Sequence, residues 1–386
     1  MANPPINQSA SCLVASPYDD DLIRQAARAC LDQLGSNPDL VLAFVTSDYQ
    51  PHLKALIEAL QIDGHATAII GGSACGLVGV GREQELISGI SLLFLRMPAT
   101  TITITEEIRA MNVPDAGLLL TNPLETSFDS ALAEWKSSYP DKPLVGGSVT
   151  GGPAEDDLFI FTAEGKCKED TLFVEFKGGV RLEPLVSPGC RPFGKPFVIT
   201  AAKGNEVLSL GQREPFTILE EAFESLGDEM QIEAEGNIFA GLAIEEEVDE
   251  FKSGDFHVHQ IVSATLTDGR LILGAPVRAG QTMQFQLRDP LAAESLLESE
   301  CHRIKDKSGT PFASLLFMGQ GRGKQLFGAE DRNIRVFEDV FGQTPLAGIY
   351  SYSEVGTVAS KHLRHSQSVC GALFYSQDHV TTRSSA

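Results

Sequence analysis

Three stretches of the sequence share one unusual pattern: an apolar segment ends in glycine or small polar residues where a loop should begin. They read ATAIIGGSACGLVG (66–79), KPLVGGSVTGGPA (142–154) and TPLAGIYSYSEVG (344–356). An apolar run of this length predicts a buried β-strand. In the third stretch the apolar character is lost at Tyr350, and we expect the strand to become the wall of a pocket there. The glycine-rich ends of the first two are expected to serve packing more than contact.

Each stretch belongs to a repeated unit of strand, helix, strand and strand. Predicted helices lie at 50–64, 128–140 and 331–342. The predicted strands lie at 39–48, 66–74 and 89–97 in the first pass, at 116–123, 142–152 and 158–165 in the second, and at 312–323, 344–356 and 368–377 in the third. Strands that alternate with helices at this spacing predict an α/β (α+β layered) fold. The first strand of each pass is almost continuously apolar, which predicts strands covered on both faces.

The segment between the second and third passes has a different character. Residues 172–213 read as hairpins with a K-G-N turn, and a helix is predicted at 214–230. Three strands joined by D-G-R and R-A-G turns follow, and then a helix at 290–306 with Pro290 at its start. No linker rich in Pro, Gly or Ser separates two halves. The sequence therefore predicts two intimately packed domains with mixed sheets and a boundary near residues 180–215.

Composition narrows the classes of partner. The chain has 52 acidic and 30 basic residues, a net charge of −22, which disfavours a nucleic-acid or anionic-membrane partner. We expect neither a secretory signal nor a membrane span. The seven cysteines lie far apart without a C-x-x-C pair, which is typical of free thiols in a reducing cytoplasm.

These residues resemble the FIST domains, a family of intracellular sensory modules in signal transduction. The resemblance of the N-terminal half rests on IIGGSACG, LVGGS and GCRPFGKPFVIT. That of the C-terminal half rests on NIFAGLAI, DGRLILGAPVRAGQTMQFQLRD, SLLFMGQGRG and TPLAGIYSYSEVG. The resemblance implies an N-terminal helical segment (1–37), a FIST N-terminal domain (38–196), a FIST C-terminal domain (197–377) and a flexible tail (378–386).

The resemblance also implies a function. FIST domains are thought to bind small ligands, with amino acids the usual suggestion, and to pass a signal to a protein partner. One bacterial branch resembles a haem-containing nitric-oxide sensor that regulates a histidine kinase, so haem is the alternative cofactor. We expect no F-box, kinase or methyl-accepting segment here, and therefore a stand-alone sensor or adaptor.

The third strand end supplies most candidate ligand-binding residues. Ser351, Tyr352 and Glu354 would line its mouth, because tyrosine offers a stacking face with a hydroxyl and glutamate can pair with an amino group. Arg322 and Gly323 lie in a glycine loop directly after a buried strand, where a guanidinium suits a carboxylate or phosphate. The alternatives are that Glu354 caps or pairs with the loop and that Arg322 is structural and holds it. The loop lacks P-loop spacing, so nucleotide hydrolysis is not indicated.

Cys190 and Arg191 form a second candidate group in a proline-bounded turn. An arginine beside a cysteine can lower the thiol pKa, although a single cysteine is more often a small core residue. No Ser/His/Asp spacing, nucleophile elbow or zinc motif is present, so we expect the chain not to be an enzyme. Cys190 is the one nucleophile worth testing.

The histidines bear on the haem alternative. His362 and His365 are three residues apart and would be adjacent on a helix, where either could ligate haem iron. The other reading is that both decorate a loop. His257 and His259 alternate on one predicted strand and point the same way, but no third ligand is evident. Three hypotheses therefore stand: a small-ligand sensor, a haem-based gas sensor, and an adaptor without a ligand.

Overall fold

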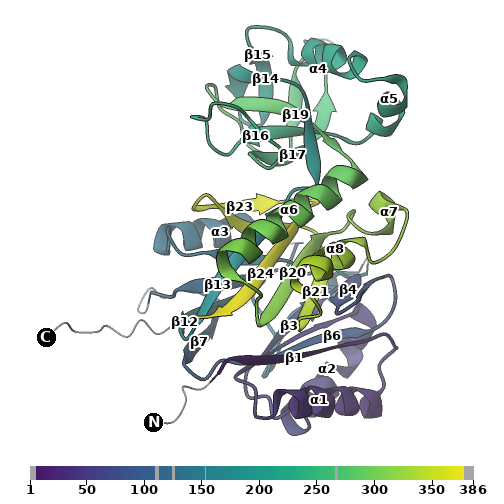
Figure 1. Cartoon of the computed structure of the whole chain (residues 1–386), viewed down its shortest axis with the longest axis vertical. Helices are drawn as coiled ribbons and strands as arrows, with labels where there is room; N and C mark the ends of the chain where they lie inside the picture. Colours follow the sequence, from purple (N-terminus) through teal and green to yellow (C-terminus); the bar gives the residue numbers. More distant parts are fainter. Residues whose placement is uncertain (1–5, 109–112, 124–126, 153, 266–267, 378–386) are drawn as a thin grey trace, which may run out of the picture. The chain divides into compact units, whose positions relative to one another are not determined.

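The computed structural model describes most of the chain and divides it into two compact units (Figure 1). The described residues are 6–108, 113–123, 127–152, 154–265 and 268–377. The first unit combines Met1–Val186 with Glu298–Ala386, and the second is Ser187–Leu297. The first unit is therefore interrupted in sequence by the second, whereas the predicted domains divide the chain once, between residues 196 and 197.

Three six-stranded mixed sheets form the first unit. In spatial order, the first sheet contains β1 (Gln8–Val14), β6 (Ile90–Arg96), β2 (Leu40–Val45), β3 (Ile69–Ser73), β10 (Ile160–Thr162) and β11 (Gly165–Lys166). The second contains β7 (Thr100–Thr105), β12 (Thr171–Gly178), β8 (Ala116–Thr121), β9 (Leu144–Ser148), β22 (Glu354–Val358) and β23 (Lys361–His365). The third contains β13 (Val180–Ser187), β24 (Val369–Ser376), β20 (Ala313–Gly319), β21 (Leu346–Ser351), β4 (Gly76–Gly79) and β5 (Arg82–Glu85).

The three sheets repeat one plan, and the predicted repeat of strand, helix and strand is confirmed. In the second pass the predicted last strand (158–165) contains β10, a hairpin strand, whereas the strand equivalent to β6 and β24 is β12. A parallel pair lies at the centre of each sheet: β2–β3, β8–β9 or β20–β21. On one side of each pair lies an antiparallel strand of the same repeat: β6, β12 or β24. The strand that precedes the repeat in sequence (β1, β7 or β13) lies beyond it and forms the edge of the sheet. In the third repeat the preceding strand is β13, and the second unit is inserted between β13 and β20.

Each repeat gives its hairpin to the sheet of another repeat. The hairpin β4–β5 of the first repeat pairs with β21 in the third sheet. The hairpin β10–β11 of the second repeat pairs with β3 in the first sheet, and β22–β23 of the third repeat pairs with β9 in the second. The exchange is cyclic: the first repeat donates to the third sheet, the third repeat to the second sheet, and the second repeat to the first sheet. Each sheet is therefore completed by a hairpin from another repeat.

One apolar core is shared by all three sheets. Alternate residues of β2 point into it, including Leu42 and Phe44, and residues of β8 and β20 such as Leu120 and Phe317 do the same. The other face of β2 packs against helices through residues such as Val41. Burial on both faces explains why the central strands read as continuous apolar runs.

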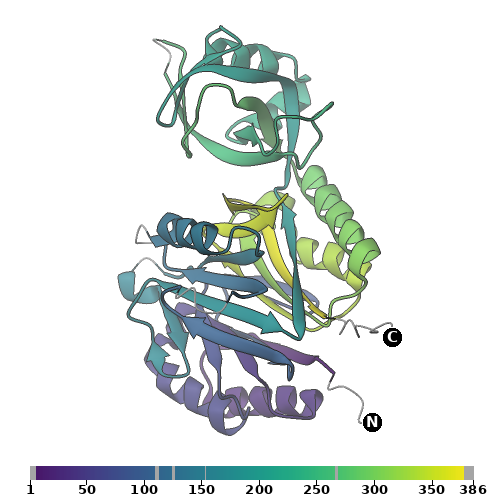
Figure 2. The same ribbon diagram turned by 90° about the vertical axis from the view of Figure 1, so that its left-hand side faces the viewer.

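Helices cover the outer faces of the sheets. Figures 1 and 2 show α1 and α2 along the outer face of the first sheet. Asp19 caps the start of α1, where its side chain accepts the Leu22 N–H, and Gly35 ends the helix in the left-handed region. The helices of this unit and its junction are α1 (Asp20–Leu34), η1 (Ser47–His52), α2 (Leu53–Ile62), α3 (Ser127–Ser138), η2 (Glu155–Asp157), α6 (Pro290–Ser308), α7 (Lys324–Phe327) and α8 (Arg332–Phe341). The predicted N-terminal helical segment thus contains a strand, β1, as well as α1.

The second unit contains a closed six-stranded barrel. Its strands, in spatial order, are β14 (Cys190–Lys203), β15 (Glu206–Leu210), β18 (Leu271–Leu273), β17 (Phe256–Ala264), β16 (Ile238–Ala243) and β19 (Thr282–Arg288). The predicted helix at 214–230 is two helices, α4 (Pro215–Glu224) and α5 (Asp228–Ala234), with Gly227 at the start of the second. The fold class is mixed α/β as predicted, but only the first unit is built from the repeat.

A glycine occupies the same position in each repeat. Gly71, Gly146 and Gly348 each lie opposite a residue of the neighbouring parallel strand, and each also pairs with the incoming hairpin. A Cβ atom would lie 1.8 Å, 1.9 Å and 2.2 Å, respectively, from a backbone carbonyl oxygen of that parallel strand. Only glycine permits this approach, because a backbone atom cannot move aside as a flexible side chain can.

We therefore expect Gly146→Ala to destabilise the first unit by at least about 2 kcal/mol, since overpacking against a fixed neighbour costs about that much. Urea unfolding followed by the fluorescence of Trp135, the chain's single tryptophan and a buried residue of the first unit, measures the loss. Gly227→Ala is the matched control, because its new methyl meets no atom within 4 Å. A midpoint for Gly146→Ala equal to that of the wild type would contradict the packing argument.

Candidate functional site

The segments that follow the three repeated strands meet at Thr150. Its Oγ1 donates a hydrogen bond to the Tyr350 carbonyl oxygen at 2.6 Å and accepts the Cys75 N–H at 3.0 Å. The Thr150 N–H donates to the Ser73 carbonyl oxygen at 3.1 Å. The strand ends of β3, β9 and β21 therefore form one junction, and the three hairpins that follow join three different sheets.

Ser351 and Glu354, two predicted ligand-binding residues, are fully buried at this junction. The Ser368 N–H donates to Glu354 Oε2 at 3.1 Å. The Ser351 hydroxyl oxygen lies 3.0 Å from Glu354 Oε1 and 3.1 Å from the Ser353 carbonyl oxygen. The Ser351 hydroxyl has one proton, and both of these oxygens lie within hydrogen-bond distance to accept it.

Burial favours a neutral Glu354. Burial raises the pKa of Glu354 to about 8, and the hydrogen bonds from Ser368 and Ser351 and the charges of Arg322 and Arg364 only partly oppose that shift. The side chain is therefore mainly a carboxylic acid at neutral pH. It acts as part of the interior at this junction rather than as a solvent-facing wall.

Arg322 is also fully buried, and it hydrogen-bonds to another side chain of this protein. Its Nε donates to Asn333 Oδ1 at 3.1 Å, and Asn333 Nδ2 donates to Glu83 Oε2 at 3.1 Å. Glu83 also accepts the Tyr350 hydroxyl and the Ile334 N–H, both at 2.6 Å. Burial raises the pKa of Glu83, and these three donors only partly oppose that shift.

The glycine loop that follows Arg322 contacts a carboxylate, but this carboxylate is the side chain of Glu85 rather than a ligand. The Lys324 N–H donates to Glu85 Oε1 at 2.6 Å, and a Cβ at Gly323 would lie 1.8 Å from that oxygen. The loop therefore packs on β5, the exchanged hairpin strand. Tyr352, in contrast, is 59% exposed at the turn between β21 and β22.

Cys190 and Arg191 lie in the second unit, at the start of β14. Cys190 is 2% exposed and packs with Phe239 and Val258. Arg191 Nε donates to Asp289 Oδ2 at 2.7 Å, which gives this side chain an ion-pair partner within the barrel. A buried thiol of this kind is a poor nucleophile.

The residues predicted for haem ligation lie on a strand rather than a helix. His362 and His365 belong to β23, and an odd spacing places them on opposite faces, so they are not adjacent. His362 Nδ1 lies 2.9 Å from Thr357 Oγ1, and Nε2 lies 3.1 Å from the Pro140 carbonyl oxygen. Both ring nitrogens therefore have partners; haem ligation by either histidine stays a prediction.

His257 and His259 do share one face of β17, as predicted, with ring centroids 4.0 Å apart. Burial, with the neighbouring His257, lowers the pKa of His259 to about 3. Within the described residues, no cluster of three or more His, Cys, Asp or Glu side chains could hold a metal ion.

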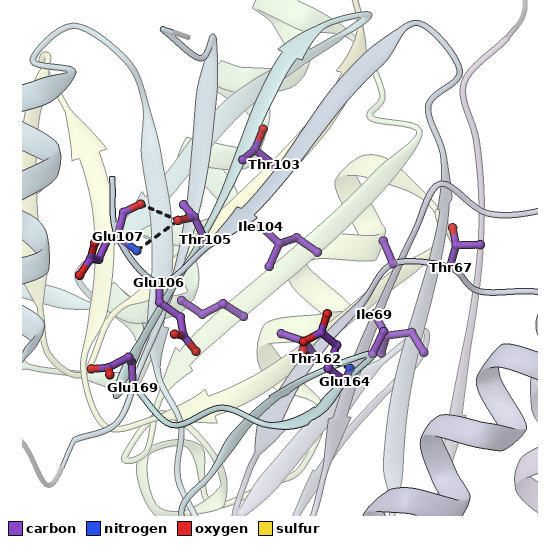
Figure 3. A pocket seen from close by; sticks show the side chains of 13 residues that line it. Thr67, Ile69, Thr103, Ile104, Thr105, Glu106, Glu107, Thr162, Glu164 and Glu169 are labelled. Carbon is purple, nitrogen blue, oxygen red and sulfur yellow. Dashed lines mark hydrogen bonds between the residues drawn. The ribbon is translucent and has the colours of Figure 1, made fainter. Parts of the chain in front are cut away.

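A cleft of about 760 Å³ lies elsewhere in the first unit, where the second sheet approaches the first. Its wall comes from β7 and the start of β12 on one side and from β3 and the β10–β11 turn on the other (Figure 3). The lining residues are Thr67, Ala68, Ile69, Thr103, Ile104, Thr105, Glu106, Glu107, Thr162, Ala163, Glu164, Glu169 and Leu172. Four are glutamates, four are threonines and none is basic.

Sequence reasoning missed this cleft. Glu164 lies in the predicted strand 158–165, but it reaches the cleft only because β10–β11 is given to the first sheet. Glu106, Glu107 and Glu169 lie outside the predicted strands and helices. The available signal was the Thr-Thr-Ile-Thr-Ile-Thr alternation of β7 followed by two glutamates.

Comparison with known sequences identifies the family. Residues 39–213 match the FIST N domain, and residues 215–357 match the FIST C domain. The chain is a FIST domain protein. The family is one of sensory signalling modules. The two FIST matches meet at residue 214, inside the second unit, so the FIST C match contains most of the barrel together with part of the third repeat.

Relatives of this FIST domain protein occur in mycobacteria. It is 28% identical over 363 residues to an uncharacterized protein of Mycobacterium tuberculosis, an alignment that covers 90% of this chain and 94% of the relative. It is 30% identical over 261 residues to an uncharacterized protein of Mycobacterium bovis, with 67% of each chain covered. Among the described residues of this protein, no helix is both long and apolar enough to cross a bilayer.

We expect the buried Glu354 to make stability depend on pH. Its folded pKa of about 8 lies above its unfolded value, so its contribution is complete below about pH 4.5 and is lost as the pH rises toward 8. Each pH unit within that window lowers the unfolding free energy by up to about 1.4 kcal/mol. Glu354→Gln, which mimics the neutral acid, should flatten the decline in thermal midpoint between pH 5 and 8.

Glu220→Gln, at an exposed glutamate of α4, is the control for the loss of one charge. Glu83 and Glu175 also have raised pKa values, so the slope should fall without vanishing. If Glu354→Gln destabilised the protein equally at pH 5 and pH 8, the carboxyl group would be an ionised partner of Arg322 and the assignment would be wrong.

Proposed function

We propose that this FIST domain protein is a cytoplasmic, non-enzymatic sensor that binds a small ligand with an amino group in the cleft and signals through a protein partner. Amino acids are the proposed class, and basic ones are preferred. The observation that carries the proposal is the cleft itself: about 760 Å³, with four glutamates and no basic residue in its lining. It lies wholly within the residues that match the FIST N domain.

Charge and shape define what the cleft would accept. Figure 3 shows Glu106, Glu107 and Glu169 on one side and Glu164 beside Thr162 on the other. Two separated acidic groups favour a ligand with two positive charges, or one with a single ammonium group that keeps its carboxylate near threonine hydroxyls. A net positive amino acid meets less repulsion here than a neutral or acidic one.

The apolar part of the lining suits an aliphatic chain. Ile69, Ile104 and Leu172 contribute this surface. A ligand with a methylene chain between its charged ends would bury that chain there, at about 25 cal/mol for each Å² removed from water. Small-molecule sites commonly combine apolar surface with a few polar groups that orient the ligand.

The position of the cleft between two sheets suggests how a protein partner would detect ligand binding. One wall of the cleft includes the β10–β11 turn, which belongs to an exchanged hairpin, and the other includes β7, an end strand of the second sheet. A ligand that contacts both walls would favour one arrangement of the two sheets. It can shift that equilibrium only by the difference in its affinity for the two arrangements.

A thermal-shift screen tests the proposal with L-lysine, L-arginine, L-leucine, L-glutamate and hemin. A ligand at 100 times its Kd adds about 2.7 kcal/mol to the native state, which should raise the thermal midpoint by about 5 °C. We expect a shift with the basic amino acids, and its loss in Glu106→Gln and Glu169→Gln. Glu220→Gln, in the second unit, should retain it.

The other outcomes separate the competing functions. A shift with hemin alone, with a Soret band that is lost on substitution of His362 or His365, would favour the haem-based sensor. No shift with any compound would favour an adaptor that works without a ligand. A shift with lysine that persists in both cleft variants would place the ligand elsewhere and contradict the proposed site.

A further inference from the structure

The end strand β7 of the second sheet has an unprotected edge. Among the described residues it pairs only with β12, so the backbone groups along its other side take part in no strand pair. Its register with β12 runs without a bulge from Thr100 opposite Gly178 to Thr105 opposite Phe173. Every residue of β7 is threonine or isoleucine, types with high β-propensity, and none is charged or proline. A regular edge of this composition is a template for pairing with another strand.

The other end strands of the three sheets are protected in ways that β7 is not. The strand β11 has only two residues, β13 contains a proline and two charged residues, and β23 contains a lysine and an arginine. The strands β1 and β5 are held by the third repeat: the Leu346 N–H donates to Ser11 Oγ at 3.1 Å, and the Glu83 N–H donates to Asp331 Oδ1 at 2.7 Å. Shortness, charge, proline and covering contacts are the usual protections of a sheet edge. The strand β7 has neither charge nor proline, and its second half borders the cleft.

Charge indicates what kind of strand this edge accepts. Glu106 and Glu107 follow β7 directly, Glu164 and Glu169 line the same cleft, and no residue of that lining is basic (Figure 3). The net charge of −22 disfavours a second copy of this chain as the occupant. We infer that the free edge of β7 docks an extended, basic segment of a protein partner, which pairs with it as an added strand. Such a partner presupposes the signalling role proposed above.

The two faces of β7 specify the pattern of the partner segment. Ile102 and Ile104 pack against the shared core, whereas Thr101 and Thr103, on the other face, are exposed. Side chains of an added strand alternate between the same two faces, and cross-strand neighbours on one face contact each other. Apolar residues of the segment would therefore lie beside the isoleucines and polar residues beside the threonines. A lysine or arginine at the end of this alternation would lie beside the glutamates, where it would compete with the proposed ligand.

Fluorescence anisotropy with a labelled peptide, KKTVTVTKK with blocked ends, measures docking to the full wild-type chain. The same peptide with N-methyl groups on its central residues keeps its charges and side chains but cannot donate strand hydrogen bonds, so it should bind at least about tenfold more weakly. The acidic peptide EETVTVTEE should bind as weakly as the N-methylated one, because its charges repel the glutamates. Hydrogen exchange of the amides of Thr100–Thr105 should slow with the first peptide only.

Variants of the cleft locate the basic end of the segment. Glu106→Gln combined with Glu107→Gln should weaken binding of the basic peptide at least about fivefold, since each exposed charge pair contributes modestly. Glu220→Gln, in the second unit, is the matched control and should bind the peptide like the wild type. L-lysine at a concentration that saturates its thermal shift should also weaken the peptide's binding.

The docking edge and the ligand site can fail separately. A thermal shift with L-lysine but no binding of the basic peptide would overturn the docking edge and leave the proposed ligand site standing. Peptide binding without a lysine shift would support the docking edge and contradict the ligand. Equal binding of the N-methylated peptide, or slowed exchange only outside β7, would overturn the strand pairing. Exchange in β7 that slows with protein concentration alone would make a second copy of this chain the occupant and overturn the inference.

Discussion

The cyclic exchange of hairpins is the constraint on which the rest of the first unit depends. Each of the three sheets gains strands from a different repeat, so no repeat can complete its sheet alone. Gly71, Gly146 and Gly348 lie on the strands that receive the hairpins, and the absence of a side chain there allows close backbone contacts. The shared core inside the three sheets then couples their folding, because its apolar residues are buried only when all three are present.

The exchange also explains why the repeated strands end in polar residues. Glu83 leaves the first repeat on β5 and meets Tyr350 and Asn333 of the third. Glu354 leaves the third repeat on β22 and is paired opposite Gly147 of the second. Side chains that looked like the wall of a ligand site are the buried polar contacts that hold the donated hairpins. Such groups must be satisfied internally, since an unpaired buried polar group is costly.

The proposed ligand site lies at the border of two sheets. The cleft is bordered by a donated hairpin and by an end strand of the second sheet. An end strand has a neighbour on one side only, so it is less constrained than a central strand. A small ligand at such a place can bias the arrangement of the sheets, and the energy available is limited to its preference for one arrangement.

The sequence by itself determined the local elements and the three-fold repeat, because apolar runs, helical periodicity and glycine punctuation are local signals. It also indicated the FIST family, and it placed Arg322, Ser351 and Glu354 near one junction. It did not reveal that these residues are buried there, that β1 precedes α1, or that His362 and His365 lie on a strand. The hairpin exchange, the non-contiguous first unit and the cleft were decided only by the tertiary structure. The physical reason is that each depends on pairing between segments from about 90 to about 270 residues apart, as in the contacts of Ile160 with Gly72 and of Val78 with Gly348. No local pattern encodes which hairpin will complete which sheet.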